Sequence, residues 1–320
     1  MLKISDQELK LAAKDKGYRP EMLEKVYRLL DLLAEFMAVP FLADRLVLKG
    51  GTAINLFCAD YFPRLSVDLD FNYIGSTDLT VMQSERPEIE RIIIDICKRK
   101  QYTLQRNPSA HAGGKMVLVY QSLMGMKGRL EIDLNYMFRV PLWDTHWQFS
   151  PDWPSKVRAH LLDVHELAAG KLHALLGRDA SRDLYDSHQL LTKWSLNEQK
   201  MRLGFTVYAA MEGRDWQQIT AYNVRFSIND IRDKLIPVLK SSEVPGTSFK
   251  AIEKWANTLV EECKTSMALV LPFKEHEIEF LRHVQEEKEI RPELITDDNF
   301  MCERILQHPL LKWRINQFGK

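Results

Sequence analysis

LVLKGGTAINLFCADYFPRLSVDLDFN, residues 46–72, is the part of the sequence that decides the fold. Residues 46–48 predict a short strand, the Gly50-Gly51 pair a turn, and residues 52–59 a helix. A second strand is expected over residues 66–73, where apolar and polar residues alternate. The stretch therefore predicts a strand, a glycine turn, a helix and a second strand in close succession.

Asp68 and Asp70 lie two residues apart on the second predicted strand. Successive side chains of a strand point to opposite faces, so both carboxylates are expected on one face, with Leu69 and Phe71 on the other. The two Cα atoms would lie roughly 7 Å apart, from a rise of about 3.3 Å per residue. Because hard cations such as Mg²⁺ prefer carboxylate oxygens and retain substrate phosphates as further ligands, the pair predicts a site for a metal and a triphosphate.

Gly50-Gly51-Thr52 stands where the first strand passes into the helix. Glycine lets a phosphate approach the backbone closely, and a helix N-terminus offers free N–H groups. Taken separately, this turn and the Asp-x-Asp strand are common structural features, but their order and separation favour a nucleotidyl-transfer site. Lys49, Arg64 and Ser66 are further candidates for nucleotide binding. Arg64 either contacts phosphate or pairs with an acid, and Ser66 shares the face of Asp68.

A third carboxylate is expected, because polymerase-type phosphoryl transfer commonly uses two metals held by acidic residues. The predicted strand over residues 129–136 offers Glu131 and Asp133 on one face. Asp133 is our candidate for a metal ligand and catalytic residue. Glu131 is the competitor, and a surface role for both remains open.

The rest of the chain predicts an α+β protein with two domains. Alternating or apolar runs predict strands over residues 102–106, 116–121 and 129–136, and helical periodicity predicts helices over residues 20–38 and 87–100. The sheet is therefore expected to be small and mixed, with helices on one side. From Val164 onward almost only helical periodicity occurs. With a linker at residues 143–154, we expect domains 1–145 and 146–320.

The composition is that of an ordinary globular protein, with 320 residues, 45% hydrophobic and 28% charged. The 44 basic and 44 acidic residues cancel, so no overall field favours nucleic acid, although a local basic patch would suffice. The four cysteines form no CxxC pair, the N-terminus has no hydrophobic signal segment, and no run of about 18 apolar residues occurs. We therefore expect a cytoplasmic protein that does not bind a membrane.

The segments KGGTAINLF, RLSVDLDF and ELAAGKLHALLGRDASRDLYD together resemble the AbiEii/AbiGii-type nucleotidyltransferase toxins of bacterial toxin–antitoxin and abortive-infection systems. The resemblance covers roughly residues 40–195. It implies a polymerase-β-like nucleotidyltransferase core with a helical C-terminal domain, a nucleoside triphosphate and Mg²⁺ as cosubstrate and cofactor, and a cognate antitoxin. Some members transfer nucleotides to the acceptor end of tRNA, whereas others are known mainly as nucleotide binders.

The resemblance also implies roles for Lys171 and Asp183 in catalysis, with Lys171 binding the nucleotide and Asp186 in the same acidic cluster. Read independently, Lys171 lies at the edge of an apolar helix face, and a lysine suits a β- or γ-phosphate. Asp183 falls in the first turn of the next helix, where the helix dipole favours a carboxylate without any function.

Three hypotheses of function remain open at this point. The first is a Mg²⁺-dependent enzyme that transfers a nucleoside monophosphate to RNA, with tRNA favoured. The second is a non-catalytic nucleotide-binding module that acts by binding a partner. The third is nucleotidylation of protein, including this chain, with Ser66 as a candidate acceptor. The basic stretch Lys98-Arg99-Lys100 is either a guide for RNA or a solvated helix end.

Overall fold

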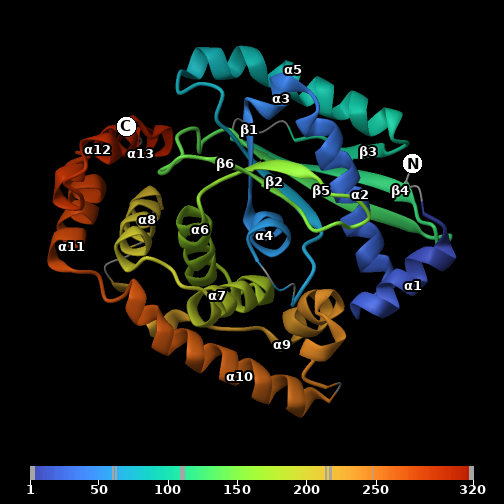
Figure 1. Cartoon of the computed structure of the whole chain (residues 1–320). Helices are drawn as coiled ribbons and strands as arrows, with labels where there is room; N and C mark the ends of the chain where they lie inside the picture. Colours follow the sequence, from blue (N-terminus) through green and yellow to red (C-terminus); the bar gives the residue numbers. More distant parts are fainter. Residues whose placement is uncertain are drawn as a thin grey trace. The chain divides into compact units, whose positions relative to one another are not determined.

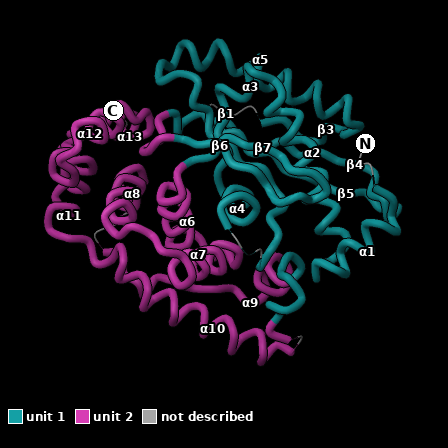
Figure 2. The backbone as a smooth tube through the Cα atoms, viewed as in Figure 1, with its two compact units in different colours: residues 1–139, 145–162, 237–244 teal, residues 140–144, 163–236, 245–320 magenta. Residues whose placement is uncertain are grey.

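The computed structural model describes residues 4–59, 61, 63–108, 112–212, 215, 218–246 and 248–316. The chain separates into two compact units, which are described in turn (Figure 2). Unit 1 contains residues 1–139, 145–162 and 237–244, and unit 2 contains residues 140–144, 163–236 and 245–320.

The helices of unit 1 begin where the sequence provides helix-start signals. Ser5 and Glu8 form the two reciprocal hydrogen bonds of a capping box ahead of α1, and Pro20 is the first residue of α2. The helical segments of this unit's N-terminal half are α1 Asp6–Lys16, α2 Pro20–Met37, α3 Pro40–Ala43, α4 Gly50–Ala53, the π-helical η1 Ile54–Cys58 and α5 Leu79–Arg99.

The described residues of unit 1 contain one mixed sheet of seven strands in the order β3-β4-β5-β2-β1-β7-β6. β2 pairs in parallel with β5, and β1 pairs in parallel with β7, whereas the other neighbours are antiparallel. The strands are β1 Leu46–Lys49, β2 Asp68–Tyr73, β3 Thr103–Arg106, β4 Gly113–Gln121, β5 Lys127–Asn135, β6 His146–Phe149 and β7 Arg158–Leu161. The predicted α+β class with a mixed sheet is confirmed.

The central strands divide their residues cleanly between an apolar and a polar face. Alternate residues that are paired across β1, β2, β4 and β5 are all apolar and buried: Leu46, Leu48, Leu69, Phe71, Tyr73, Met116, Leu118, Tyr120, Leu130, Ile132 and Leu134. Helix α2 covers this face, with the ring of Phe36 6.4 Å from that of Phe71, and crosses the strands in Figure 1. Helix α5 reaches the same face, because Glu85 accepts a hydrogen bond from Tyr73. The opposite face carries the polar residues of these strands, together with Val47, Val117 and Val119.

Strands β6 and β7 differ from the sequence-based division of the chain. Residues 146–320 were expected to form the helical domain, and residues 143–154 a linker. In the structure β7 joins the sheet beside β1, with Leu161 opposite Leu48, and β6 pairs with β7. Each strand has only four residues, too few for a clear alternation, so pairing with the distant β1 decides their conformation.

Helices alone supply the regular structure in the described part of unit 2, as the periodicity after Val164 indicates. Helix α6 packs against both α7 and α8. The α-helices are α6 Val164–Gly177, α7 Ser181–Lys193, α8 Glu198–Met211, α9 Ile228–Asp230, α10 Phe249–Ser266, α11 Glu275–Arg282, α12 Asn299–Gln307 and α13 Pro309–Asn316. The remaining short 3-10 and π segments of the chain are η3 Ala221–Asn223, η4 Ile231–Leu235, η5 Ile236–Val238, η6 Ser241–Glu243, η7 Met267–Leu269, η8 His283–Glu287 and η9 Pro292–Leu294. Over the described residues, no helix combines the length and the apolar character needed to cross a membrane.

Glu166 is a buried acid that ties residues 140–144 to the helices of unit 2. Its Oε2 accepts a hydrogen bond from the Leu142 amide at 2.9 Å, and its Oε1 accepts one from the Tyr208 hydroxyl at 3.2 Å. Burial raises the pKa of Glu166 to about 7, although these two hydrogen bonds lower it in part. The carboxyl group therefore binds a proton more tightly in the folded chain than in the unfolded chain.

We expect Glu166→Gln to make the stability of unit 2 less dependent on pH. In the wild type, the contribution of the protonated Glu166 is fully present below the unfolded pKa of 4.5 and is lost as the pH rises through about 7. The free energy of unfolding of the wild type minus that of the variant should fall by about 3 kcal/mol across this window. Urea unfolding between pH 4 and pH 8 measures the difference, and Glu253→Gln on the exposed side of α10 is the control. A difference that does not change with pH would contradict the assignment.

Candidate functional site

Gly50 lies directly against the carboxylate of Asp70. Its φ of +71° is in the left-handed region, where side chains are rarely tolerated. A Cβ placed on Gly50 would lie only 2.3 Å from Asp70 Oδ2. Both the backbone conformation and the close approach require glycine at this position, so the turn after β1 and the acid on β2 form one unit.

The neighbouring Gly51 packs over Arg64 and Ser66, the two residues predicted to flank the acidic pair. A Cβ on Gly51 would lie 2.8 Å from both Arg64 Nη2 and Ser66 Oγ. The Ser66 hydroxyl donates a hydrogen bond of 3.0 Å to Asp68 Oδ1, and Arg64 Nη1 donates one of 2.7 Å to the Leu65 carbonyl. Arg64 and Ser66 are 2% and 1% exposed. In this structure they support the turn and Asp68 from inside the protein.

A segment far along the chain pairs with the backbone around Arg64, and no local pattern predicts this contact. The Leu65 amide donates to the Val238 carbonyl at 2.8 Å, and the Lys240 amide donates to the Pro63 carbonyl at 2.8 Å. Residues 237–244, far along the chain, therefore form part of the frame around the acidic strand.

Thr52 and Asn55 fasten the start of the helical segment to the strands. Thr52 is fully buried, and its hydroxyl donates to the backbone carbonyl of Asp68. Asn55 Nδ2 donates to the Gly51 carbonyl at 3.0 Å. Both side chains thus fix the backbone of the turn relative to Asp68.

The strand register brings the predicted acids of β2 and β5 together on the polar face. In the parallel pair, Asp70 lies opposite Asp133, and Asp68 lies opposite Glu131. In the antiparallel pairs on either side, Lys49 lies opposite Asp70 and Lys115 lies opposite Asp133. Four neighbouring strands thus present a row of side chains, Lys115, Asp133, Asp70 and Lys49.

The two candidates for the third carboxylate differ in their partners. Glu131 forms an ion pair with Lys115, with Oε2 2.9 Å from Nζ. Asp133 has no hydrogen bond or ion pair with any residue that the structure describes. Among the described residues, the Asp133 carboxylate therefore has fewer hydrogen bonds and ion pairs than that of Glu131.

Lys115 was not identified from the sequence. Its position beside Asp133 follows from the pairing of β4 with β5, and no local motif marks it. Burial disfavours its charged form, but the hydrogen bond to Glu131 and the charges of Glu131, Asp68 and Asp70 raise its pKa overall. The same acids that were predicted to hold a metal therefore stabilise the charge of this lysine.

Lys171 and Asp183 lie together in unit 2, whereas the residues above belong to unit 1. Lys171 Nζ is 2.9 Å from Asp183 Oδ1 and 3.0 Å from Asp186 Oδ2, and Arg178 Nε is 2.6 Å from Asp183 Oδ2. Burial by itself raises the pKa of Asp183, but the charges of Lys171 and Arg178 outweigh it and lower the pKa. Lys171 and the two buried carboxylates link α6 to α7, and the more exposed Arg178 pairs with them from the segment between the two helices.

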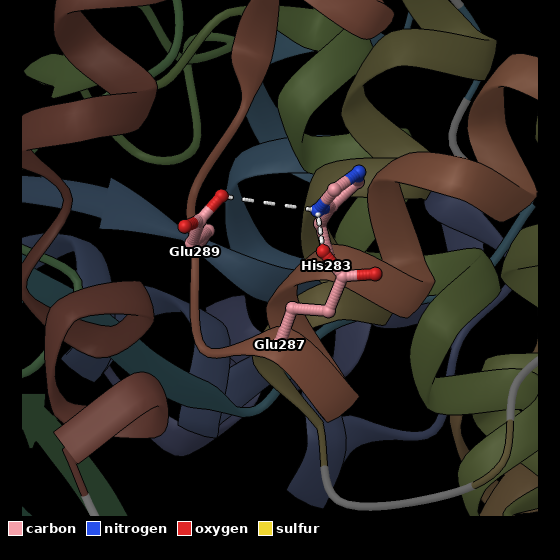
Figure 3. A group of neighbouring side chains, drawn as sticks. All are labelled: His283, Glu287 and Glu289. Atoms are coloured by element: carbon pink, nitrogen blue, oxygen red, sulfur yellow. Dashed lines mark ion pairs between the residues drawn. The ribbon is translucent and has the colours of Figure 1, made fainter.

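A second group of metal-binding side chains occurs in unit 2 (Figure 3). Within the described residues, only His283, Glu287 and Glu289 bring three metal-binding atoms within 4.8 Å of one another. His283 Nδ1 lies 2.6 Å from Glu287 and 4.0 Å from Glu289. Arg282 pairs with the other oxygen of Glu287, and Arg291 Nη1 lies 3.4 Å from His283 Nε2. Because Glu287 already pairs with both His283 and Arg282, we interpret the group as an ion-pair cluster.

Gly50→Ala is expected to destabilise the protein more than the same change at Gly125. Both glycines have positive φ, but a Cβ on Gly125 meets nothing within 4 Å, whereas one on Gly50 collides with Asp70. Backbone strain alone costs about 1 kcal/mol at Gly125, and displacement of Asp70 raises the cost at Gly50 to about 3 kcal/mol. Urea unfolding of both variants gives the comparison. Equal losses would show that Gly50 is needed only for its backbone conformation.

Asp183→Asn is expected to lower the free energy of unfolding by about 3 kcal/mol, because Lys171 and Arg178 lose a buried counter-charge. Asp233→Asn, which removes an exposed partner of Arg232, is the control and should change stability by less than about 0.5 kcal/mol. The comparison uses urea unfolding at pH 7. A loss at Asp183 no larger than that at Asp233 would exclude a structural role for the cluster.

Comparison with known proteins identifies the family. A family model described as nucleotidyl transferase AbiEii toxin, type IV TA system, matches residues 31–302. The solved structure of MenT4, a nucleotidyltransferase toxin from Mycobacterium tuberculosis H37Rv, is similar with a TM-score of 0.59 and 15% identity, over 93% of this chain and 98% of that chain. At this identity the likeness shows a shared fold, and no curated protein sequence matches the chain. Because the family model spans most of the sequence, the chain belongs to the AbiEii nucleotidyltransferase toxins of type IV toxin–antitoxin systems.

Proposed function

We propose that this nucleotidyltransferase transfers a nucleoside monophosphate from a nucleoside triphosphate to a hydroxyl of RNA, with tRNA as the favoured acceptor and Mg²⁺ as the cofactor. The observation that carries the proposal is the register of β2 and β5, which sets Asp70 beside Asp133, with Asp68 on the same face. The family supplies the reaction class, and the toxin role implies a cognate antitoxin as a partner. We place the reaction in the cytoplasm, where triphosphates and tRNA are both available.

The acids of the polar face are of the kind that binds a divalent cation, but their carboxylate oxygens are not gathered within 4.8 Å of one another as the ligand atoms of His283, Glu287 and Glu289 are. Asp68, Asp70 and Asp133 supply the carboxylate oxygens that Mg²⁺ prefers, and a bound cation would have to draw them together. When bound, Mg²⁺ would neutralise phosphate charge and polarise the α-phosphate. The charges of Glu131, Asp68 and Asp70 also favour the charged form of Lys115.

The Gly50-Gly51 turn is the proposed site for the β- and γ-phosphates. Without side chains, the two residues let phosphate oxygens approach the backbone, and Lys49 at the end of β1 adds a positive charge in the row beside Asp70. The Thr52 hydroxyl fixes the turn by its hydrogen bond to the Asp68 carbonyl. The buried Arg64 and Ser66 pack against Gly51, and Ser66 also donates a hydrogen bond to Asp68. These residues hold the triphosphate so that the α-phosphate faces the acids.

The transfer joins the acceptor oxygen to the α-phosphorus and breaks the bond between that phosphorus and the oxygen bridging to the β-phosphate. Pyrophosphate leaves with the bridging oxygen and its electron pair, and the acceptor hydroxyl loses its proton. Asp133, whose carboxylate has no partner among the described residues, is the proposed group that orients this hydroxyl and accepts its proton. Positioning and electrostatics supply most of the catalysis in such reactions.

The roles that we propose for Lys171 and Asp183 come from the family resemblance. Lys171 is proposed to bind a β- or γ-phosphate, with Asp183 and Asp186 holding its ammonium group in place. A lysine anchored by two buried carboxylates has a fixed direction, which suits a point charge that meets a phosphate.

The competing hypotheses make different use of the same residues. A non-catalytic nucleotide-binding module requires the glycine turn to bind the triphosphate. It does not require Asp133 as a third carboxylate. Nucleotidylation of Ser66 requires an accessible hydroxyl, whereas Ser66 is 1% exposed and its hydroxyl donates a hydrogen bond to Asp68. Both observations favour transfer to an external acceptor.

Asp68→Asn is expected to reduce transfer by about 1,000-fold, because the substitution keeps the shape of the side chain and removes its charge. The assay follows α-³²P label from each of the four ribonucleoside triphosphates, with Mg²⁺, to total tRNA and to the protein itself. Asp95→Asn on the exposed side of α5 is the matched control and should retain full activity. Label on tRNA that is lost only in Asp68→Asn supports the proposal. Triphosphate binding without label on RNA would favour the binding module, and label on the protein would favour the third hypothesis.

A further inference from the structure

Beyond the acidic row, the polar face of the sheet carries a group of cations contributed by β3, β4 and β5. Lys115 lies opposite Asp133, Arg129 lies opposite Val119, and Lys127 lies opposite Gln121. Arg106 lies opposite Val117, which in turn lies opposite Glu131. Side chains that are paired across strands share a face, so all four cations lie on the face that bears Asp133. We name Arg106, Lys115, Lys127 and Arg129 the basic face.

The basic face is exposed to solvent. All four of its side chains are exposed, whereas the alternate residues of β4 and β5 are buried beneath α2 and α5 on the apolar face. The same three strands contribute only two acids, Glu131 and Asp133. In a chain whose net charge is zero, this is a local excess of positive charge.

Two of the cations are oriented by neighbouring polar groups. Gln105 Oε1 accepts a hydrogen bond of 3.1 Å from Arg129 Nε, and Glu131 holds Lys115 at 2.9 Å. These contacts fix the charged groups of Arg129 and Lys115 on the polar face of the sheet. Arg106 and Lys127 have no ion pair with any described residue, so their charges are available to an anionic partner.

The position of the basic face relative to the acids indicates what it binds. The strand order places the glycine turn on the β1 side of Asp70 and the basic face on the β5–β4 side of Asp133. Phosphoryl transfer needs the attacking and leaving oxygens roughly in line on opposite sides of the phosphorus. If pyrophosphate leaves over Gly50 and Gly51, the acceptor hydroxyl enters from the side of β5 and β4.

We propose that the basic face binds the phosphate backbone of the RNA acceptor and directs its hydroxyl toward Asp133. This inference rests on the proposed function, since it assigns the acceptor of that reaction to a surface. Positive side chains on an open sheet fit a polyanion, and phosphate contacts position a nucleic acid without reading its sequence. The surface therefore selects for phosphate-rich RNA, and other parts of the protein must supply any sequence preference.

The basic stretch that is visible in the sequence lies elsewhere. Lys98-Arg99-Lys100 forms the end of α5, which packs with the helices of the apolar face. Lys100 is engaged in ion pairs with Asp31 at 3.0 Å and Glu35 at 2.7 Å. Lys98 and Arg99, together with Arg91 on the same helix, therefore provide a control set of cations.

The test removes three charges from the basic face and three from α5. The first variant is Arg106→Gln, Lys127→Gln, Arg129→Gln, which leaves Lys115 and the proposed metal ligands intact. The matched control is Arg91→Gln, Lys98→Gln, Arg99→Gln. Binding of fluorescein-labelled bulk tRNA is measured by anisotropy without triphosphate, between 50 and 200 mM salt. Binding of Mg²⁺ and triphosphate is measured separately by calorimetry.

We expect the first variant to raise the Kd for tRNA by about 10-fold or more and to reduce the slope of log Kd against log salt by about 2, with triphosphate binding unchanged. The control should bind tRNA as the wild type does. Unchanged tRNA binding in the first variant, or an equal loss in both variants, would overturn the inference.

Separate measurements test the role of the basic face and the proposed transfer reaction. Because tRNA binding is measured without triphosphate, loss of binding in the first variant supports the basic face even if the wild type transfers no label. Conversely, label transferred to tRNA by a variant that still binds normally would uphold the function and remove the basic face from it.

Discussion

The parallel pairing of β2 with β5 is the constraint on which the proposed site depends. It sets Asp70 opposite Asp133 and Asp68 opposite Glu131, although β2 and β5 are separated along the chain by α5, β3 and β4. A shift of β2 by one residue would turn Asp68 and Asp70 into the apolar face. The buried residues Leu69 and Phe71 prevent this shift, because both would then have to leave the core under α2. The same apolar contacts that stabilise the sheet therefore fix the positions of the acids.

Around this pair, the protein uses buried polar contacts to hold flexible groups in place. Ser66 fixes one oxygen of Asp68, Thr52 fixes the backbone of Asp68, and the glycine turn packs against Asp70 and the buried Arg64. Residues 237–244 complete this frame through backbone hydrogen bonds to residues 63–65. Each contact is modest in free energy, but together they hold the acids and the turn in one arrangement, as an enzyme that works by positioning requires. The cations of the basic face lie on the exposed part of the polar face.

Much of this arrangement follows from local patterns. The strands around residues 46–48, 66–73, 102–106 and 129–136 were expected from alternating or apolar runs, and the helix at Pro20 from its start signal, because these signals act within a few residues. The strands β6 and β7 were missed, since segments of four residues acquire their conformation from pairing with β1. Lys115 and the basic face were missed for a related reason: their residues are scattered over three strands, and no motif connects them.

The sequence by itself determined the family, the α+β class, and the glycine turn followed by two acids on one strand face. These features depend on backbone conformation and on the alternation of side chains, which neighbouring residues set. Only the tertiary structure decided that Asp133 stands beside Asp70, that Arg64 and Ser66 are buried supports, and that Lys171 and Asp183 form a buried cluster in a separate unit. The physical reason is that strand register and burial arise from contacts between residues far apart along the chain, where the free energy of packing the apolar faces selects one pairing.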